Sequence, residues 1–117
     1  MARPFSIFLG IVLLAVGLVG TASGGHSHNL VVFGINASHN LVHVLSGALA
    51  IAAGLAGTRY AMIYCLAFGT VYGVVAVLGF FNVAFVVDLL NLNLADNFLH
   101  LAISVACLWV GGMSKSG

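Results

Sequence analysis

His39-Asn40-Leu41-Val42-His43 is matched 57 residues later by Asp96-Asn97-Phe98-Leu99-His100. In each copy a His follows an acid or an imidazole by four positions. The two side chains of each copy therefore lie on one face of a helix, about one turn apart. The two motifs predict two helices with a polar face, and the rest of the chain decides what kind of helices these are.

The composition predicts an integral membrane protein. Hydrophobic residues make up 62% of the 117 residues, charged residues make up 4%, and the mean hydropathy is +1.22. Such a chain cannot cover a soluble surface with polar side chains. A helical span needs about 20 apolar residues, and four stretches approach that length, at residues 4–21, 38–56, 60–81 and 96–112. We predict an all-α fold, a four-transmembrane-helix bundle in a single domain of residues 1–117.

The charged residues predict the orientation of this bundle. Arg3, Arg59 and Lys115 lie beside the termini and the second connection, whereas Asp88 and Asp96 lie on the opposite side. Basic residues accumulate on the cytoplasmic side, so both termini are expected in the cytoplasm and all five His residues toward the external face. The apolar run after the first Arg resembles a secretory signal, but we expect an uncleaved anchor.

The recurrence of the motif also predicts two tandem hairpin repeats, about residues 1–58 and 59–117. The first spans of the two repeats match more weakly, as Leu9-Gly10-Ile11-Val12 resembles Phe68-Gly69-Thr70-Val71. Two-span units keep one membrane orientation, so an axis along the membrane normal would relate them. This symmetry predicts that the motif faces of spans two and four point toward each other. The last connection, residues 82–95, is expected to lie along the membrane interface with an extra helical turn.

Small residues are expected at the helix contacts, because lipid gives helices little hydrophobic reason to associate. Cys65 and Cys107 are interpreted in the same way, as small packing residues. The predicted packing positions are Gly10, Gly17, Ser46, Gly47, Ala50, Gly54, Gly69 and Gly73.

At its two motifs the chain resembles an uncharacterised bacterial family of four-helix integral membrane proteins, a domain of unknown function. The first motif reads N-x-x-H-N-x-V-H-x-x-x-G from Asn36 to Gly47, and the second reads N-x-x-D-N-x-L-H from Asn93 to His100. The resemblance covers most of the chain and implies a four-helix membrane domain of a bacterial inner, or other energy-transducing, membrane. It implies no biochemical activity.

Three interpretations of the polar residues stay open. In the first they form a structural cluster, in which Asp96 accepts hydrogen bonds from His39 or His43 and the Asn side chains bridge spans two and four. In the second, His39, His43, Asp96 and His100 hold a transition metal such as Zn²⁺. In the third, His43 or His100 is the axial ligand of a haem or chlorophyll-type pigment. The structural cluster would comprise His39, Asn40, His43, Asp96, Asn97 and His100, and the space for a pigment would come from Gly47, Ala50 and Ser104.

The sequence predicts no enzyme. It has no Ser/His/Asp set at a supportive spacing, no paired carboxylates and no phosphate loop, and its net charge of +1 offers nothing to nucleic acid. His26-Ser27-His28 is interpreted as a solvated loop. We expect a scaffold or accessory subunit without a cofactor, whose partners are the lipid bilayer and other membrane subunits or further copies of the chain. Metal or pigment binding is the alternative.

Overall fold

The computed structural model describes residues 1–24, 26, 28–30 and 33–114. Within these residues, four helices are long and apolar enough to cross a membrane. The chain is thus a multi-pass membrane protein with an all-α fold, and the predicted spans agree with these helices to within two residues at every end. The four helices are α1 (Ala2–Ala22), α2 (Ala37–Ala56), α3 (Thr58–Phe80) and α5 (Leu94–Met113).

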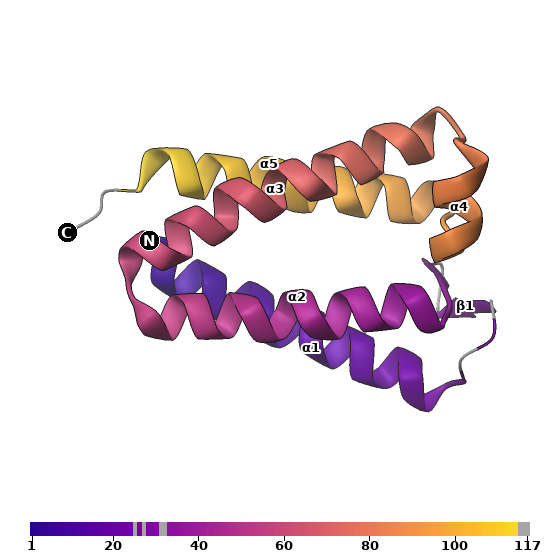
Figure 1. Cartoon of the computed structure of the whole chain (residues 1–117), viewed down its shortest axis with the longest axis horizontal. Helices are drawn as coiled ribbons and strands as arrows, with labels where there is room; N and C mark the ends of the chain where they lie inside the picture. The colour runs from indigo at the N-terminus through magenta and orange to yellow at the C-terminus, as the bar shows by residue number, and fades with distance from the viewer. Residues whose placement is uncertain (25, 27, 31–32, 115–117) are drawn as a thin grey trace.

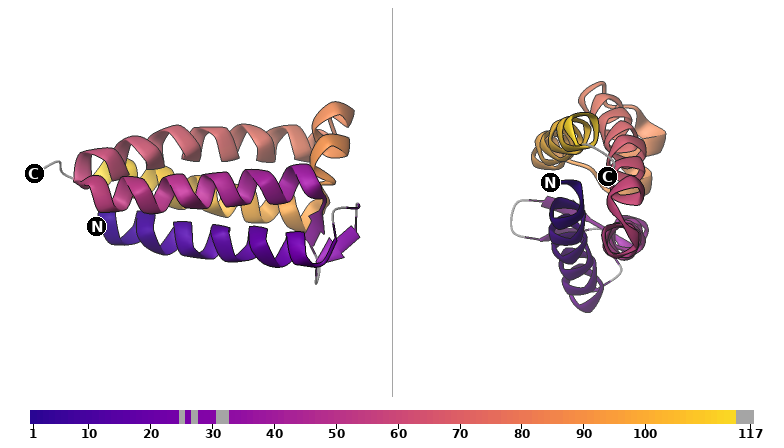
Figure 2. Two further views of the ribbon diagram at one scale, coloured as in Figure 1. Left: turned by 60° about the horizontal axis from the view of Figure 1, so that its bottom comes forward. Right: turned by 90° about the vertical axis from the view of Figure 1, so that its left-hand side faces the viewer.

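The four helices form two closely packed pairs. α1 packs along α2 and α3 packs along α5, whereas contact between the pairs is sparser (Figures 1 and 2). α2 and α3 are joined at Gly57, whose φ of +153° suits a residue without a side chain. From this turn α2 and α3 diverge toward the other end of the molecule (Figure 1). The three histidines described below lie near these far ends.

The backbones of α1 and α2 touch at glycines. A Cβ added to Gly47 would lie 2.6 Å from the backbone nitrogen of Leu14 and 2.7 Å from the carbonyl oxygen of Gly10. The hydroxyl of Ser6 donates a hydrogen bond of 2.6 Å to the carbonyl of Ala50 in the same contact. Small residues therefore let the two helices approach closely, as expected in lipid. Of the predicted packing positions, Gly10, Gly17, Gly47, Ala50 and Gly54 lie between α1 and α2.

α3 and α5 meet in a comparable way. A Cβ on Gly73 would lie 2.7 Å from the hydroxyl oxygen of Ser104, and that hydroxyl donates a 2.6 Å hydrogen bond to the carbonyl of Gly69. Cys65 and Cys107 are buried free thiols in this contact. Their burial among helix atoms agrees with the interpretation as packing residues.

The side chains of the two motif asparagines pack against glycines at corresponding positions of the two helix pairs. Asn40 Oδ1 occupies the place that a Cβ on Gly20 would take, and Asn97 Oδ1 does the same at Gly79. Each glycine thus leaves room beside its Cα for an asparagine side chain of the neighbouring helix. Two related hairpins would share this packing, but the tandem repeat itself stays a prediction.

A short sheet and a short helix cover one end of the bundle. Strands β1 (His28–Leu30) and β2 (Phe33–Ile35) pair antiparallel, and α4 (Ala84–Leu90) lies at the same end (Figure 1). The Asn91 side chain donates to the carbonyls of His28 and Ile35, at 3.1 and 2.9 Å. We call these three elements the end cap. The helical turns expected between residues 82 and 95 are confirmed by α4, whereas the strands had not been predicted.

Charge is divided between the two ends. Arg3 donates from Nε to the carbonyl of Gly54 at 2.9 Å, so it caps the last turn of α2. Arg59 follows the turn at the same end, whereas Asp88 and Asp96 lie at the end that carries the end cap. Lys115 lies outside the described residues.

Candidate metal centre

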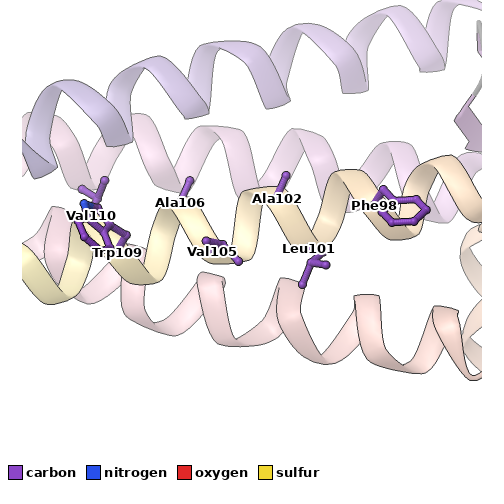
Figure 3. Close-up of a pocket in the computed structure, with 7 residues that line it drawn as sticks. All are labelled: Phe98, Leu101, Ala102, Val105, Ala106, Trp109 and Val110. Carbon is purple, nitrogen blue, oxygen red and sulfur yellow. The ribbon is translucent and has the colours of Figure 1, made fainter.

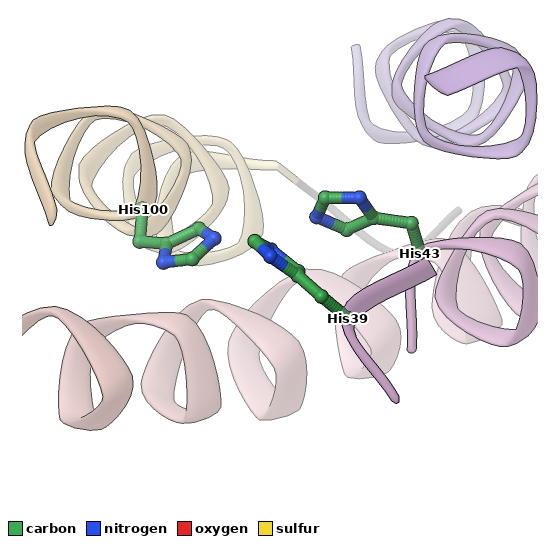
Figure 4. Close-up of side chains that lie close together, drawn as sticks. All are labelled: His39, His43 and His100. Carbon is green, nitrogen blue, oxygen red and sulfur yellow. The ribbon is translucent and has the colours of Figure 1, made fainter. Parts of the chain in front are cut away.

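Three histidines converge between α2 and α5, beneath the end cap. His39 and His43 lie one turn apart on α2, and His100 of α5 points toward them (Figure 4). Among the described residues these three form the group that could hold a metal ion, because one ring nitrogen of each lies within 4.8 Å of the others. The ring centroids of His39 and His43 are 4.4 Å apart, and that of His100 lies 5.5 and 6.3 Å from them. At most 4% of each residue is exposed.

The helix starts place these rings. The side chain of Asn36 accepts a 2.9 Å hydrogen bond from the backbone N–H of His39, which fixes the first turn of α2. Asn93 caps α5 in the same way, accepting from the backbone N–H of Asp96 at 3.0 Å. His43 and His100 therefore occupy equivalent positions, each as the seventh residue of its helix, nearly two turns from the helix start. Both face the space between the helix pairs.

The imidazoles have few partners. Both ring nitrogens of His39 and His43, and Nδ1 of His100, have no hydrogen-bond partner among the described residues. The backbones of Gly34 and Leu90 approach the His39 ring, but neither completes a hydrogen bond of good geometry. An unpaired buried polar group costs about 1–3 kcal/mol, and buried polar groups are usually paired with protein atoms, an ordered water or an ion. Five unpaired ring nitrogens in one place therefore favour a bound water or ion beside them.

Asp96 does not join the cluster. Its Oδ2 accepts hydrogen bonds of 2.9 Å from the backbone N–H of Gly34 and from that of Asn93. The second bond completes a capping box, in which the Asn93 and Asp96 side chains satisfy each other's backbone N–H groups. The prediction that Asp96 accepts from His39 or His43 is corrected, and the candidate ligands are three rather than four.

The two asparagines also lie outside the cluster. Asn40 points toward α1 at Gly20, and Asn97 points toward α3 at Gly79. Each follows its neighbour His39 or Asp96 by one residue, which turns its side chain about 100° around the helix. The expectation that these amides bridge spans two and four is therefore corrected. Of the six predicted polar residues, the structure brings together the three histidines.

A small cavity opens beside the histidines. Its volume is about 80 Å³, enough for an ion with a water or two, since one water occupies roughly 30 Å³ of liquid. Organic ligands need pockets of roughly 300–1,000 Å³. The cavity is lined by the three His rings, by Ser46 and Tyr72, and by the apolar side chains of Val42, Phe68, Val71, Val75 and Leu90.

A haem or chlorophyll-type pigment does not fit this arrangement. The cavity is too small for a macrocycle. Gly47 and Ala50, which were expected to make room, face α1 instead, and the Ser104 hydroxyl is bonded to Gly69. A larger hollow of about 650 Å³ lies on the exposed face of α5 (Figure 3). Its lining contains none of the histidines and consists of the side chains of Phe98, Leu101, Ala102, Val105, Ala106, Trp109 and Val110.

The two remaining histidines lie apart from this centre. The rings of His26 and His28 stack with centroids 4.3 Å apart. The ring nitrogens of His28 lie 2.7 Å from the carbonyl of His26 and 3.0 Å from the hydroxyl of Ser23. His28 is therefore already engaged. Ser27, between them, lies outside the described residues.

Sequence reasoning missed Tyr72 as part of the site. Its ring centroid lies 5.6 Å from that of His100, and only 4% of the residue is exposed. The sequence places Tyr72 in Gly69-Thr70-Val71-Tyr72, one helix turn after a predicted packing glycine, which indicates that its side chain faces another helix. This pattern does not predict that the Tyr72 ring contacts His100.

Comparison with known protein families shows which family the chain belongs to. The model of the family described as "Domain of unknown function (DUF4383)" matches residues 3–113 of the chain. The chain belongs to this family. The DUF4383 match agrees with the resemblance seen in the sequence, and it assigns no activity. No curated protein and no solved structure matches the chain, so its function has to be inferred from its residues.

Proposed function

We propose that this DUF4383 protein binds a transition metal ion, Zn²⁺ or another borderline divalent ion, through His39, His43 and His100. The observation that carries the proposal is the convergence of three buried imidazoles, in which five of the six ring nitrogens have no hydrogen-bond partner among the described residues. Neutral imidazole suits zinc, copper, nickel and iron. Three protein ligands are also the usual number for a zinc site that leaves one position open.

The backbone around His39 supports the proposed metal binding. A metal-bound imidazole usually donates its other ring N–H to a carbonyl or carboxylate, which fixes the ring. The backbones of Gly34 and Leu90 lie beside the His39 ring and could serve as such acceptors. A purely structural polar cluster would instead be held by hydrogen bonds among its side chains, and within the described residues these three rings make no hydrogen bond to one another.

Metal content tests the proposal. The protein purified in detergent is expected to hold one Zn²⁺ per chain after dialysis, and His43→Ala combined with His100→Ala is expected to abolish that binding. The loss should exceed the about 10–100-fold that removal of an outer-shell partner costs. Elemental analysis and calorimetric titration with Zn²⁺ measure both results.

The chain supplies a matched control for this experiment. His26→Ala combined with His28→Ala removes the same number of imidazoles from the same end of the molecule, outside the cluster. This variant should keep the stoichiometric metal. Equal loss of metal from both double variants, or a metal-free wild type in excess Zn²⁺, would contradict the proposal.

We infer that both termini face the cytoplasm and that the metal centre lies toward the external side. Arg3 and Arg59 at one end and Asp88 and Asp96 at the other support this orientation. A role as scaffold or accessory subunit remains the alternative, favoured by the apolar hollow on α5, which another helix could cover. Co-purification from native membranes tests it, and a protein that always migrates alone would count against it.

A further inference from the structure

We propose that the metal keeps a fourth coordination position, which takes a water-derived or other small anion inside the 80 Å³ cavity, and that the Tyr72 hydroxyl donates a hydrogen bond to that ligand. This inference rests on the proposed metal binding. It adds the chemical class of the exogenous ligand and a residue that recognises it.

The first support is the shape of the cavity. The three imidazoles border it from α2 and α5, while Tyr72 of α3 borders it from another side. Figure 4 shows the three rings turned toward a common point, with α3 running past them. A metal held by these rings would have room for one more small ligand in this cavity. Small metal sites with three protein ligands and an open position bind water or substrate there.

The second support is the Tyr72 hydroxyl. It is buried and lies near Ser46, yet it has no hydrogen-bond partner of good geometry among the described residues. Buried tyrosine hydroxyls usually find a partner. The neighbouring Tyr64 follows that rule, since its hydroxyl donates a 2.9 Å hydrogen bond to the carbonyl of Ser46. A metal-bound anion in the cavity would give Tyr72 the acceptor that it lacks.

The third support is charge. Three neutral imidazoles leave the full charge of a divalent ion in an apolar surrounding, and burying uncompensated charge is costly. The buried acid of α5, Asp96, lies outside the ligand group, and its Oδ2 accepts from two backbone N–H groups. An anionic fourth ligand would lower the net charge of the centre. The cavity volume limits that ligand to a few atoms, such as hydroxide or a small linear anion.

The test uses the full chain in detergent, loaded with Co²⁺ as a spectroscopic replacement for Zn²⁺. Sodium azide is titrated in while the visible absorption of the cobalt is recorded. We expect a saturable spectral change at one azide per cobalt. Tyr72→Phe should weaken azide binding about tenfold, the loss of one hydrogen bond to a charged group, and should leave Co²⁺ affinity unchanged. Tyr60→Phe, an exposed tyrosine on the same helix, should change neither.

The other outcomes separate the two proposals. A cobalt centre that forms but does not respond to azide would overturn the open position and leave metal binding in place. Equal azide affinity of wild type and Tyr72→Phe, or loss of the cobalt spectrum in Tyr72→Phe, would overturn the assigned role of the hydroxyl. A chain that binds no Co²⁺ would overturn both proposals. The wild-type titration tests the open position even if a variant does not fold.

Discussion

Replacing Gly47 with alanine is expected to lower the free energy of unfolding by about 3 kcal/mol, near the upper end for overpacking in a core. The new methyl group would lie 2.6 Å from the backbone nitrogen of Leu14 and 2.7 Å from the carbonyl oxygen of Gly10. Both obstacles are backbone atoms, so neither can move aside by changing a rotamer. α1 and α2 would have to separate along their contact. Unfolding of the detergent-solubilised protein in SDS, followed by circular dichroism, measures the loss.

Two other glycines provide comparisons for this substitution. A Cβ on Gly112 would have no atom within 4 Å, so Gly112→Ala should be neutral or slightly stabilising, because alanine favours helix over glycine. Gly79→Ala should fall between the two, since its obstacle is the end of the Asn97 side chain, which can rotate. If Gly47→Ala proved as stable as Gly112→Ala, the direct backbone contact between α1 and α2 would be refuted.

The long helices could be predicted from the sequence because lipid leaves few alternatives. A chain in the hydrocarbon region must satisfy its backbone internally, so apolar stretches of about 20 residues become helices. The positions of Asn36 and Asn93 further define where α2 and α5 begin, since asparagine side chains cap free backbone N–H groups. The same helical periodicity placed His43 and His100 on inward faces.

Side-chain partners could not be predicted in the same way. Periodicity puts His39 and Asp96 in equivalent places, but the carboxylate turns back to the helix start and to Gly34, which is 62 residues away. The sequence did contain a signal for this, because Asn93-x-x-Asp96 has the spacing of a capping box. The strands of the end cap are three residues long, too short for a periodic pattern, and they depend on a distant Asn91.

Replacing Asp96 with alanine is expected to lower the free energy of unfolding by about 3 kcal/mol, since hydrogen bonds to charged groups contribute about 1.5–3 kcal/mol each. The backbone N–H groups of Gly34 and Asn93 would both lose their acceptor. Because the first belongs to β2 and the second starts α5, the end cap should loosen over the histidines. Faster hydrogen exchange at the Gly34 amide, and faster release of bound Zn²⁺ to a chelator, would measure this loosening.

Asp96→Asn should have a smaller effect, because an amide oxygen still accepts hydrogen bonds but makes them about half as strong as a carboxylate does. Asp88→Ala is the matched control, since Asp88 is the other acidic residue of the sequence and is exposed on α4. It should change neither Gly34 exchange nor metal release. If Asp96→Ala left Gly34 exchange unchanged and yet abolished Zn²⁺ binding, Asp96 would belong to the ligand set, and its assigned role in holding the end cap to α5 would be wrong. The exchange rate therefore separates a residue that closes the site from one that coordinates the metal.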